Sequence, residues 1–318
     1  MKINYNPIIQ KLSSSLFEEQ NLLVDVLRLD LIHPEISGNK WFKLKLNLEK
    51  AKALNFKTVI TFGGAFSNHI AATASACKLE GINCIGIIRG EESQNLNSTL
   101  LKAKQDGMLL HFVNRETYSK KTEVSFANYL LKTFGDYYLI PEGGNNDEGV
   151  LGCTEILKTE WDYDFIFIAC GTAATYAGVL AGAKTNQTVV GINVLKGENL
   201  LVKDALDKLE SIFKNKTFTI NGNEELEKLQ IENSCITNNY CFNGYANLTN
   251  ELIEFKNKFE KEFNIPLDYI YTNKLFYAVF DIINKNKIRP NSKVLIIHSG
   301  GLQGNKGFEE RYHLMPTL

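Results

Sequence analysis

The chain has 318 residues, and its 35 lysines and arginines nearly balance its 36 aspartates and glutamates, which gives a net charge of −1. This balance excludes the basic surface that nucleic acids select and the polybasic segment that anionic membranes attract. The apolar runs are too short to cross a bilayer, and the N-terminus does not lead into the apolar core of a signal peptide. We therefore expect a cytoplasmic protein that binds neither nucleic acid nor membrane.

Helical and strand patterns alternate along the chain. After an apolar run over residues 22–32, Trp41, Leu44, Leu48 and Ala51 recur at helical spacing and predict an amphipathic helix. Dense apolar runs predict strands at residues 58–62, 84–88, 109–113, 137–140, 165–169, 189–194 and 294–297. Further helices are predicted at residues 67–79, 97–105, 123–134, 248–259 and 273–283. Such alternation indicates an α/β fold with mostly parallel sheets. Between residues 213 and 240 asparagine and glutamate interrupt the pattern, and residues 221–225 predict a turn.

Six cysteines are scattered along the chain, mostly beside apolar residues. They form no Cys-x-x-Cys pair and no cluster with histidine at the spacing of a zinc site. Buried cysteines of this kind stay reduced in a reducing compartment. The sequence therefore predicts no metal centre.

Lys40 lies in the first turn of the first predicted amphipathic helix, at the border of its apolar face. A partly desolvated amine near the positive end of a helix dipole loses proton affinity. A lysine of that kind can form a Schiff base. The alternative is an ordinary lysine whose stem lies along a packed helix.

Two strand–loop–helix corners offer anion sites. In residues 62–69, two glycines allow close backbone approach, Ser67 is a good N-cap, and Ser67, Asn68 and His69 suit a carboxylate. In residues 169–178, two hydroxyls and the loop amides suit a phosphate, although the spacing is neither that of a dinucleotide fingerprint nor that of a P-loop. Each corner alone is also common in α/β proteins. Together with Lys40 they form the set that a pyridoxal phosphate enzyme needs for an amino-acid substrate.

The motifs in combination resemble one enzyme family. They are Ser37-Gly38-Asn39-Lys40-x-x-Lys43-Leu44, Ser67-Asn68-His69, Pro141-Glu142-Gly143-Gly144, Asp268-Tyr269-Ile270-Tyr271-Thr272-Asn273-Lys274 and His298-Ser299-Gly300-Gly301. In this order they resemble the 1-aminocyclopropane-1-carboxylate deaminase/D-cysteine desulfhydrase family, over essentially the whole chain. The resemblance implies a two-lobed, tryptophan synthase β-like (fold type II) enzyme that binds pyridoxal 5'-phosphate.

The resemblance also implies roles for individual residues. Lys40 would form the Schiff base with the cofactor, and the residues implied in catalysis are Lys40, Tyr271, Ser67 and Tyr245. The residues implied in binding the cofactor are Lys40, Asn39, Lys43, Asn68, Gly171, Thr172, Ala173, Ala174, Thr175 and Thr272. Ser67, Asn68 and His69 would hold the substrate carboxylate and the phenolic oxygen of the cofactor. Ala173 and Ala174 depart from the glycine-richer phosphate loop of the family.

The motif positions suggest where the lobes divide. We expect a large cofactor-binding domain of residues 1–44 and 151–318, and a smaller α/β domain of residues 45–150 that covers the active-site cleft. The family resemblance suggests a homodimer that acts on a small amino acid.

Thr272 favours one of the two activities of the family. It follows Tyr271, where the family places the partner of the pyridine nitrogen, and the cyclopropane-opening deaminases resemble one another in having glutamate there. A carboxylate keeps that nitrogen protonated, whereas a hydroxyl leaves the ring close to neutral. A neutral ring suffices when thiolate leaves the β-carbon. We therefore expect D-cysteine desulfhydrase-like β-elimination to pyruvate, sulfide and ammonia, although Thr272 could equally be a helix N-cap.

Three alternatives bear on this prediction. Within the class, the chain could be a 1-aminocyclopropane-1-carboxylate deaminase or an eliminase of another small amino acid. From another class, a non-catalytic two-lobed small-molecule binding protein would have no need of a lysine after Gly38-Asn39. An NAD-dependent dehydrogenase would need a glycine-rich fingerprint followed by an acidic residue, which the sequence lacks. His298 is expected to be structural, at the end of a buried strand.

Overall fold

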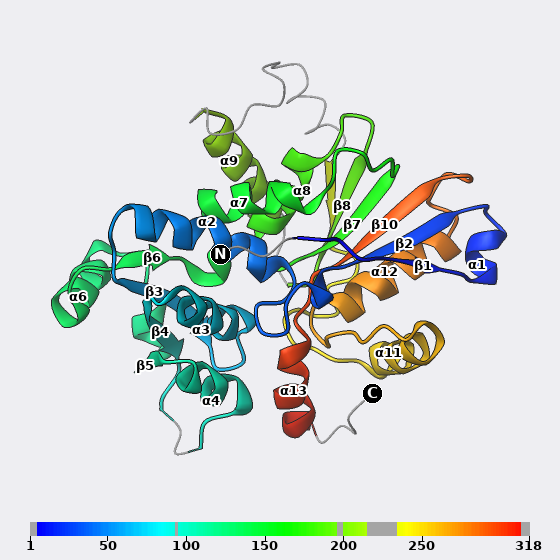
Figure 1. The fold of residues 1–318 in the computed structure, drawn as a ribbon. Coiled ribbons are helices and arrows are strands. Elements are labelled where there is room, and N and C mark those ends of the chain that lie inside the picture. The colour runs from blue at the N-terminus through cyan, green and yellow to red at the C-terminus, as the bar shows by residue number, and fades with distance from the viewer. Residues whose placement is uncertain (1–4, 93–94, 196–199, 215–233, 313–318) are drawn as a thin grey trace.

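The computed structural model describes residues 5–92, 95–195, 200–214 and 234–312. Two twisted sheets lie side by side, and each is covered by helices (Figure 1). The strands predicted from the sequence are all present, and every pairing but one is parallel. The α/β prediction is therefore confirmed. The turn predicted at residues 221–225 lies outside the described residues.

The larger sheet has six strands, two of which precede and four of which follow the segment that forms the smaller sheet. In spatial order they are β1 (Ile9–Leu12), β2 (Leu23–Arg28), β10 (Lys293–His298), β7 (Phe165–Cys170), β8 (Thr188–Asn193) and β9 (Ser234–Thr237). Only β1 runs antiparallel to its neighbour. Four consecutive side chains of β10, from Val294 to Ile297, have no exposed surface, because helices cover both faces of the sheet. Of these strands, β1, β2 and β9 were not predicted: β1 and β9 are short and border polar segments, and β2 lies in the stretch of residues 22–32 that was described only as an apolar run.

The smaller sheet has four parallel strands. In spatial order they are β5 (Met108–Val113), β4 (Asn83–Arg89), β3 (Thr58–Gly64) and β6 (Tyr138–Ile140). The helices of this part of the chain are α3 (Asn68–Glu80), α4 (Ser98–Gln105), α5 (Arg115–Ser119) and α6 (Val124–Phe134). Helix α3 is buried along nearly its whole length, which explains its run of alanines. The largest apolar cluster continues from this sheet into the larger one, so the two lobes share a core.

Two helices join the lobes, α2 (Asn39–Ala53) and α7 (Asp147–Cys153). They pack so closely that a Cβ on Gly152 would lie 2.0 Å from the carbonyl oxygen of Phe42. The predicted domain limits, at residues 44 and 150, fall inside these two helices. The two sheets draw their strands from the predicted segments, and the position of the limits stays a prediction.

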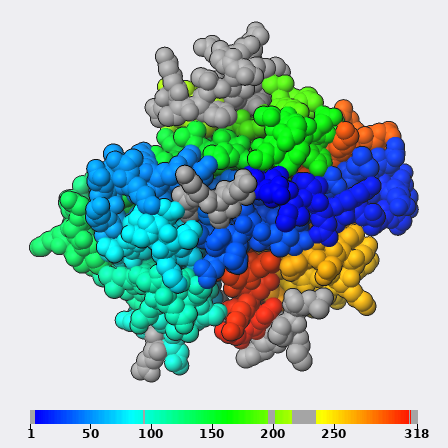
Figure 2. Space-filling view, in the orientation of Figure 1, coloured from blue at the N-terminus to red at the C-terminus, as the bar shows by residue number. Residues whose placement is uncertain are grey.

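The remaining helices surround the larger sheet. They are α1 (Ser15–Glu18), α8 (Ala173–Gly182), α9 (Leu200–Lys214), α11 (Asn250–Phe263), α12 (Thr272–Asn284) and α13 (Asn305–Tyr312). Figure 2 shows α13, in red, between the smaller lobe and α11. Gly307 of α13 packs on the ring of Phe66 in the smaller lobe. Within the described residues, no helix is long and apolar enough to cross a membrane.

The structure excludes the alternative considered for Thr272, that it is a helix N-cap. Thr272 is not the N-cap of α12 but its first residue, and its side chain is fully buried. The carboxylate of Asp268 caps this helix instead, because its two oxygens accept the backbone N–H groups of Ile270, Tyr271 and Thr272 at 2.7–2.9 Å. A carboxylate four residues upstream satisfies these N–H groups better than a hydroxyl within the first turn.

Candidate active site

Four helices begin around one cleft of about 1030 Å³ between the lobes. Helices α2 and α3 reach it at their first residues, and α8 and α12 reach it from the larger lobe. Strands β3 and β7 end there, as is usual for ligand sites in parallel sheets. Helix N-termini concentrate backbone N–H groups and positive potential, so the cleft suits an anionic ligand.

Lys40 lies in the first turn of α2 and lines this cleft. Its Nζ donates to the side-chain oxygen of Asn39 at 2.9 Å. Burial and, next in size, the positive charge of Lys43 lower the pKa of Lys40 to about 7. The amine is therefore partly neutral, and hence nucleophilic, at physiological pH.

Lys43, one turn further along α2, connects the smaller lobe to the predicted phosphate loop. Its side chain is buried, and Nζ donates to the hydroxyl of Thr172 at 3.0 Å and to the carbonyl oxygen of Gly143 at 2.9 Å. Burial lowers its pKa to about 8, so the side chain remains mostly cationic at pH 7. Asn39 makes a parallel connection, because its Nδ2 donates to the hydroxyl of Thr175 at 2.8 Å.

The phosphate loop is only partly exposed to the cleft. Gly171, Thr172 and Thr175 line it, whereas Ala173 and Ala174 are fully buried. The backbone N–H of Ala174 already donates to the side-chain oxygen of Asn145 at 3.1 Å. Asn145, which sequence reasoning missed, therefore takes one of the amides that the loop was expected to offer.

Ser67 and Asn68 lie at the start of helix α3 and line the same cleft as Lys40. Ser67 is its N-cap, as predicted, and its hydroxyl accepts the N–H of Ile70 at 3.3 Å. The side-chain oxygen of Asn68 accepts a hydrogen bond from Gln303 of the larger lobe at 2.7 Å. Within the described residues the Nδ2 of Asn68 has no acceptor, so it can donate to a ligand in the cleft. No sequence signal marked Gln303.

His69 has a defined protonation state. The single proton of the Thr61 hydroxyl goes to the carbonyl oxygen of Ile140 at 2.8 Å, so the Nε2–H of His69 donates to Thr61 at 2.8 Å. Burial, with the charges of Lys40 and Lys43, holds the pKa of His69 well below its usual value. Its Nδ1 is thus a buried acceptor, for which the described residues provide no donor. It can accept from a bound ligand but cannot donate to a carboxylate.

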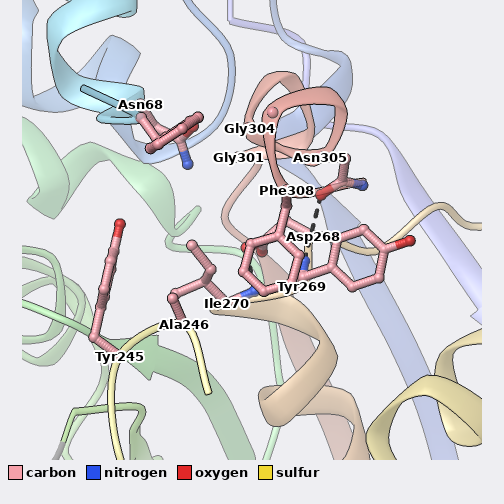
Figure 3. Close-up of a pocket in the computed structure, with 12 residues that line it drawn as sticks. Asn68, Tyr245, Ala246, Asp268, Tyr269, Ile270, Gly301, Gly304, Asn305 and Phe308 are labelled. Carbon is pink, nitrogen blue, oxygen red and sulfur yellow. Dashed lines mark hydrogen bonds between the residues drawn. The ribbon is translucent and has the colours of Figure 1, made fainter. Parts of the chain in front are cut away.

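Tyr271 and Tyr245 form an edge-to-face pair, with ring centres 6.2 Å apart. Burial raises the pKa of both phenols, and a hydrogen bond between the two hydroxyls raises that of Tyr271 further. Gly171 makes room for Tyr271, since a Cβ there would lie 2.6 Å from its ring. Figure 3 shows the hydroxyl of Tyr245 directed toward Asn68. The structure thus brings both predicted tyrosines to the same cleft.

Thr272, like Ala173 and Ala174, is a predicted site residue that does not line the cleft. Its hydroxyl donates to Asp268 Oδ1 at 2.8 Å and accepts the N–H of Asp268 at 2.7 Å. Asp268 itself was missed, although an acidic residue four positions before a helix is a recognisable cap signal.

The residues present fit pyridoxal phosphate. Lys43 and the start of α8 offer cationic and N–H donors for its phosphate, Lys40 offers a nucleophilic amine for its aldehyde, and His69 offers an acceptor for its phenol. In the part of the chain that the structure describes, no three acidic, histidine or cysteine side chains converge to hold a metal ion.

Comparisons with known proteins agree with this fit. Residues 16–300 match the family model described as pyridoxal-phosphate dependent enzyme. The chain is 30% identical over 305 residues to the bifunctional D-cysteine desulfhydrase/1-aminocyclopropane-1-carboxylate deaminase of Arabidopsis thaliana, with 88% of this chain and 72% of that protein covered. It is 29% identical over 292 residues to a Pyrococcus abyssi protein provisionally named 1-aminocyclopropane-1-carboxylate deaminase, with 88% and 85% covered.

A solved structure gives the same answer. The crystal structure of a homologue of 1-aminocyclopropane-1-carboxylate deaminase superposes with a TM-score of 0.81 at 26% identity, and the match covers 98% of this chain and 95% of that one. The chain therefore belongs to the pyridoxal-phosphate dependent enzymes of fold type II, and among them to the 1-aminocyclopropane-1-carboxylate deaminase/D-cysteine desulfhydrase family.

Proposed function

We propose that this enzyme is a D-cysteine desulfhydrase-like lyase that eliminates a β-substituent and releases pyruvate, sulfide and ammonia. One observation supports β-elimination over ring opening. At the start of α12, Thr272 stands where a deaminase of the family has glutamate, and the nearby carboxylate of Asp268 is engaged by three backbone N–H groups and by the Thr272 hydroxyl. The Thr272 hydroxyl bonds to Asp268 and does not line the cleft, so a pyridine nitrogen near the start of α12 would lack a carboxylate partner and the ring would stay neutral.

The anchoring roles follow from the contacts. Lys43 and the N-terminus of α8 would hold the cofactor phosphate, and Asn39 connects Thr175 to α2. Ser67, the Nδ2 of Asn68 and the first N–H groups of α3 hold the substrate carboxylate. Pyridoxal phosphate, when bound, supplies a sink for the electron pair left on the α-carbon.

The proton transfers follow from the pKa values. Lys40, with a pKa of about 7, accepts the α-proton at Nζ. Tyr271 and Tyr245 keep their protons at neutral pH, because a phenol ordinarily has a pKa of about 10 and desolvation raises the pKa of both. They therefore act as donors, and a tyrosine hydroxyl protonates the sulfur as the bond from sulfur to the β-carbon breaks. The enamine product released from the enzyme hydrolyses to the keto acid and ammonia.

A substrate panel tests the proposal directly. D-cysteine, L-cysteine, D-serine and 1-aminocyclopropane-1-carboxylate are compared by the rate of keto-acid release. We expect D-cysteine to have the highest kcat/KM, and Lys40→Ala to abolish both turnover and the visible absorption of the loaded enzyme. A preference for 1-aminocyclopropane-1-carboxylate, the activity in the names of both curated relatives, would replace the proposal with its main alternative.

Thr272 is tested separately. We expect Thr272→Glu to raise the ratio of deaminase to desulfhydrase activity, because a carboxylate at this position can keep the pyridine nitrogen protonated. Thr272→Ser, which retains the hydroxyl, is the matched control and should leave the ratio unchanged. An unchanged ratio in the glutamate variant, with the cofactor bound normally, would contradict the role proposed for this position.

We further propose a cytoplasmic homodimer with the domain limits given above. The cytoplasmic location is supported by the cysteines, all six of which are described and outside any disulfide. The dimer rests on the family resemblance alone. Light scattering coupled to size-exclusion chromatography measures the oligomeric state, and a mass of one chain would exclude the dimer.

A further inference from the structure

Lys274 is a buried lysine that the proposed chemistry does not use. It lies on α12, its side chain has no exposed surface, and among the described residues no carboxylate lies within ion-pair distance. Its Nζ instead donates to three backbone carbonyl oxygens, those of Gly244 at 2.7 Å, Cys241 at 2.8 Å and Val194 at 3.3 Å. An ammonium group has three protons, so every donor is used.

Two of the three carbonyls belong to an unusual turn, residues 241–246. Phe242, Asn243 and Ala246 have φ values of 47°, 63° and 56°, and Gly244 has a φ of 110°. The left-handed region is costly for side chains other than glycine, by about 1–2 kcal/mol for each residue. Such a turn persists only where its surroundings hold it.

Helix α12 provides those surroundings. Besides the Lys274 ammonium, the ring of Tyr277 packs edge-to-face on Phe242, with centres 5.2 Å apart. Lys274 and Tyr277 are three residues apart and so lie on the same side of the helix. Tyr271 lies three residues before Lys274, immediately before the helix begins. One helix thus holds Tyr271 directly and contacts the turn that carries Tyr245.

We propose that Lys274 is a positioning residue for catalysis: its ammonium ties the 241–246 turn to α12, and the tie places the Tyr245 hydroxyl against Tyr271 in the cleft. The role of Tyr245 belongs to the proposed function, on which this inference rests. The alternative is a lysine that only fills space in the core.

The charge of Lys274 supports the inference. Burial lowers the pKa of Lys274 to about 8, and interactions with the Cys241 side chain and the Asp268 carboxyl group act in the opposite direction. The side chain is therefore mostly an ammonium at pH 7 and mostly an amine at pH 9.5. A neutral amine has only two protons and directs a lone pair at the third carbonyl. The tie should therefore weaken as the pH rises through 8.

Hydrogen exchange on the cofactor-free protein tests the tie without any activity measurement. We expect Lys274→Met, which keeps the length of the side chain but has no donor, to raise amide exchange in residues 241–247 at least about tenfold. Lys285→Met is the control, because Lys285 is an exposed residue at the end of the same helix. Unchanged exchange in Lys274→Met would overturn the proposal.

Kinetics test the link to Tyr245. We expect Tyr245→Phe to lower kcat by about 10²–10⁴-fold, as for loss of a general acid, and Lys274→Met to lower kcat more than it changes KM. If Lys274 acts through Tyr245, the double variant is no slower than the slower single variant. If the fold-losses in kcat of the two single variants instead multiply in the double variant, the proposal is overturned. If Tyr245→Phe is fully active while the turn of Lys274→Met exchanges faster, Lys274 positions the turn and the proposed role of Tyr245 fails.

Two further measurements test the proposed role of Lys274 if Lys274→Met does not fold. In the wild-type protein, exchange of residues 241–247 should rise between pH 7 and pH 9.5 beyond the intrinsic effect of pH, relative to α12 itself. In Lys274→Ala, the three carbonyls are left without their donor, and added n-butylammonium should restore part of the protection of the turn. If exchange shows no excess rise with pH and n-butylammonium restores no protection, the charge of Lys274 does not hold the 241–246 turn in place, and the proposal is overturned.

Discussion

Gly38→Ala should displace the start of helix α2, which carries Lys40. Gly38 has φ 68° and ψ −150°, a conformation that is essentially confined to glycine. Its N–H donates to the carbonyl oxygen of Leu29 at 2.9 Å, and the next N–H donates to the carbonyl oxygen of Ser299 at 3.2 Å. A Cβ on residue 38 would lie 1.9 Å from that same Ser299 oxygen. The start of α2 therefore depends on the absence of a side chain.

The size of the effect follows from two terms. The backbone conformation costs a non-glycine residue about 1–3 kcal/mol. Relief of the overlap requires the backbone to move, and overpacking of this kind costs about 1–3 kcal/mol more. We therefore expect Gly38→Ala to lower the free energy of unfolding by about 2–6 kcal/mol, a large part of the roughly 5–15 kcal/mol that is usual for a folded domain.

Urea denaturation of the cofactor-free protein measures the loss. Gly81→Ala is the matched control, because Gly81 also has a positive φ, 65°, but a Cβ there meets nothing within 4 Å. The control should lose only about 1–2 kcal/mol and keep normal cofactor binding. Gly38→Ala should lose more stability and should also bind pyridoxal phosphate more weakly, because Lys40 moves with the segment. Equal stability of the two variants would refute the reasoning.

Three further predictions concern single groups. The rate at which acetic anhydride labels Lys40 in the cofactor-free protein should have a midpoint near pH 7, because only the neutral amine reacts. Lys43→Met should move this midpoint to higher pH, because it removes a neighbouring positive charge. A wild-type midpoint above pH 9 would contradict the burial of the amine. Asp268→Asn should cost about 1–2 kcal/mol in urea denaturation, since the carboxylate caps α12, and a neutral result would exclude that role. Gly152→Ala should cost about 1–3 kcal/mol, because its Cβ would meet the carbonyl oxygen of Phe42 at 2.0 Å; unchanged stability would mean that α2 and α7 separate without cost.

The sequence by itself determined the fold class and the position of the reactive lysine. Both depend on interactions between residues near each other along the chain, since apolar runs predict strands and helical spacing predicts α2. The lowered pKa of Lys40 was also expected, from desolvation and the helix dipole. In the structure burial is the largest cause, and the charge of Lys43, one turn further along the same helix, is the next.

Only the tertiary structure decided which polar group satisfies which partner. Thr272 seemed a natural cap by position, yet Asp268 takes the N–H groups of α12, because the preceding turn brings its carboxylate onto them. The acceptor state of His69 depends on Ile140, and the turn that carries Tyr245 depends on a lysine 29 residues further along the chain. A buried donor or acceptor must find a partner, and the folded backbone, not spacing along the sequence, determines which partner is within reach.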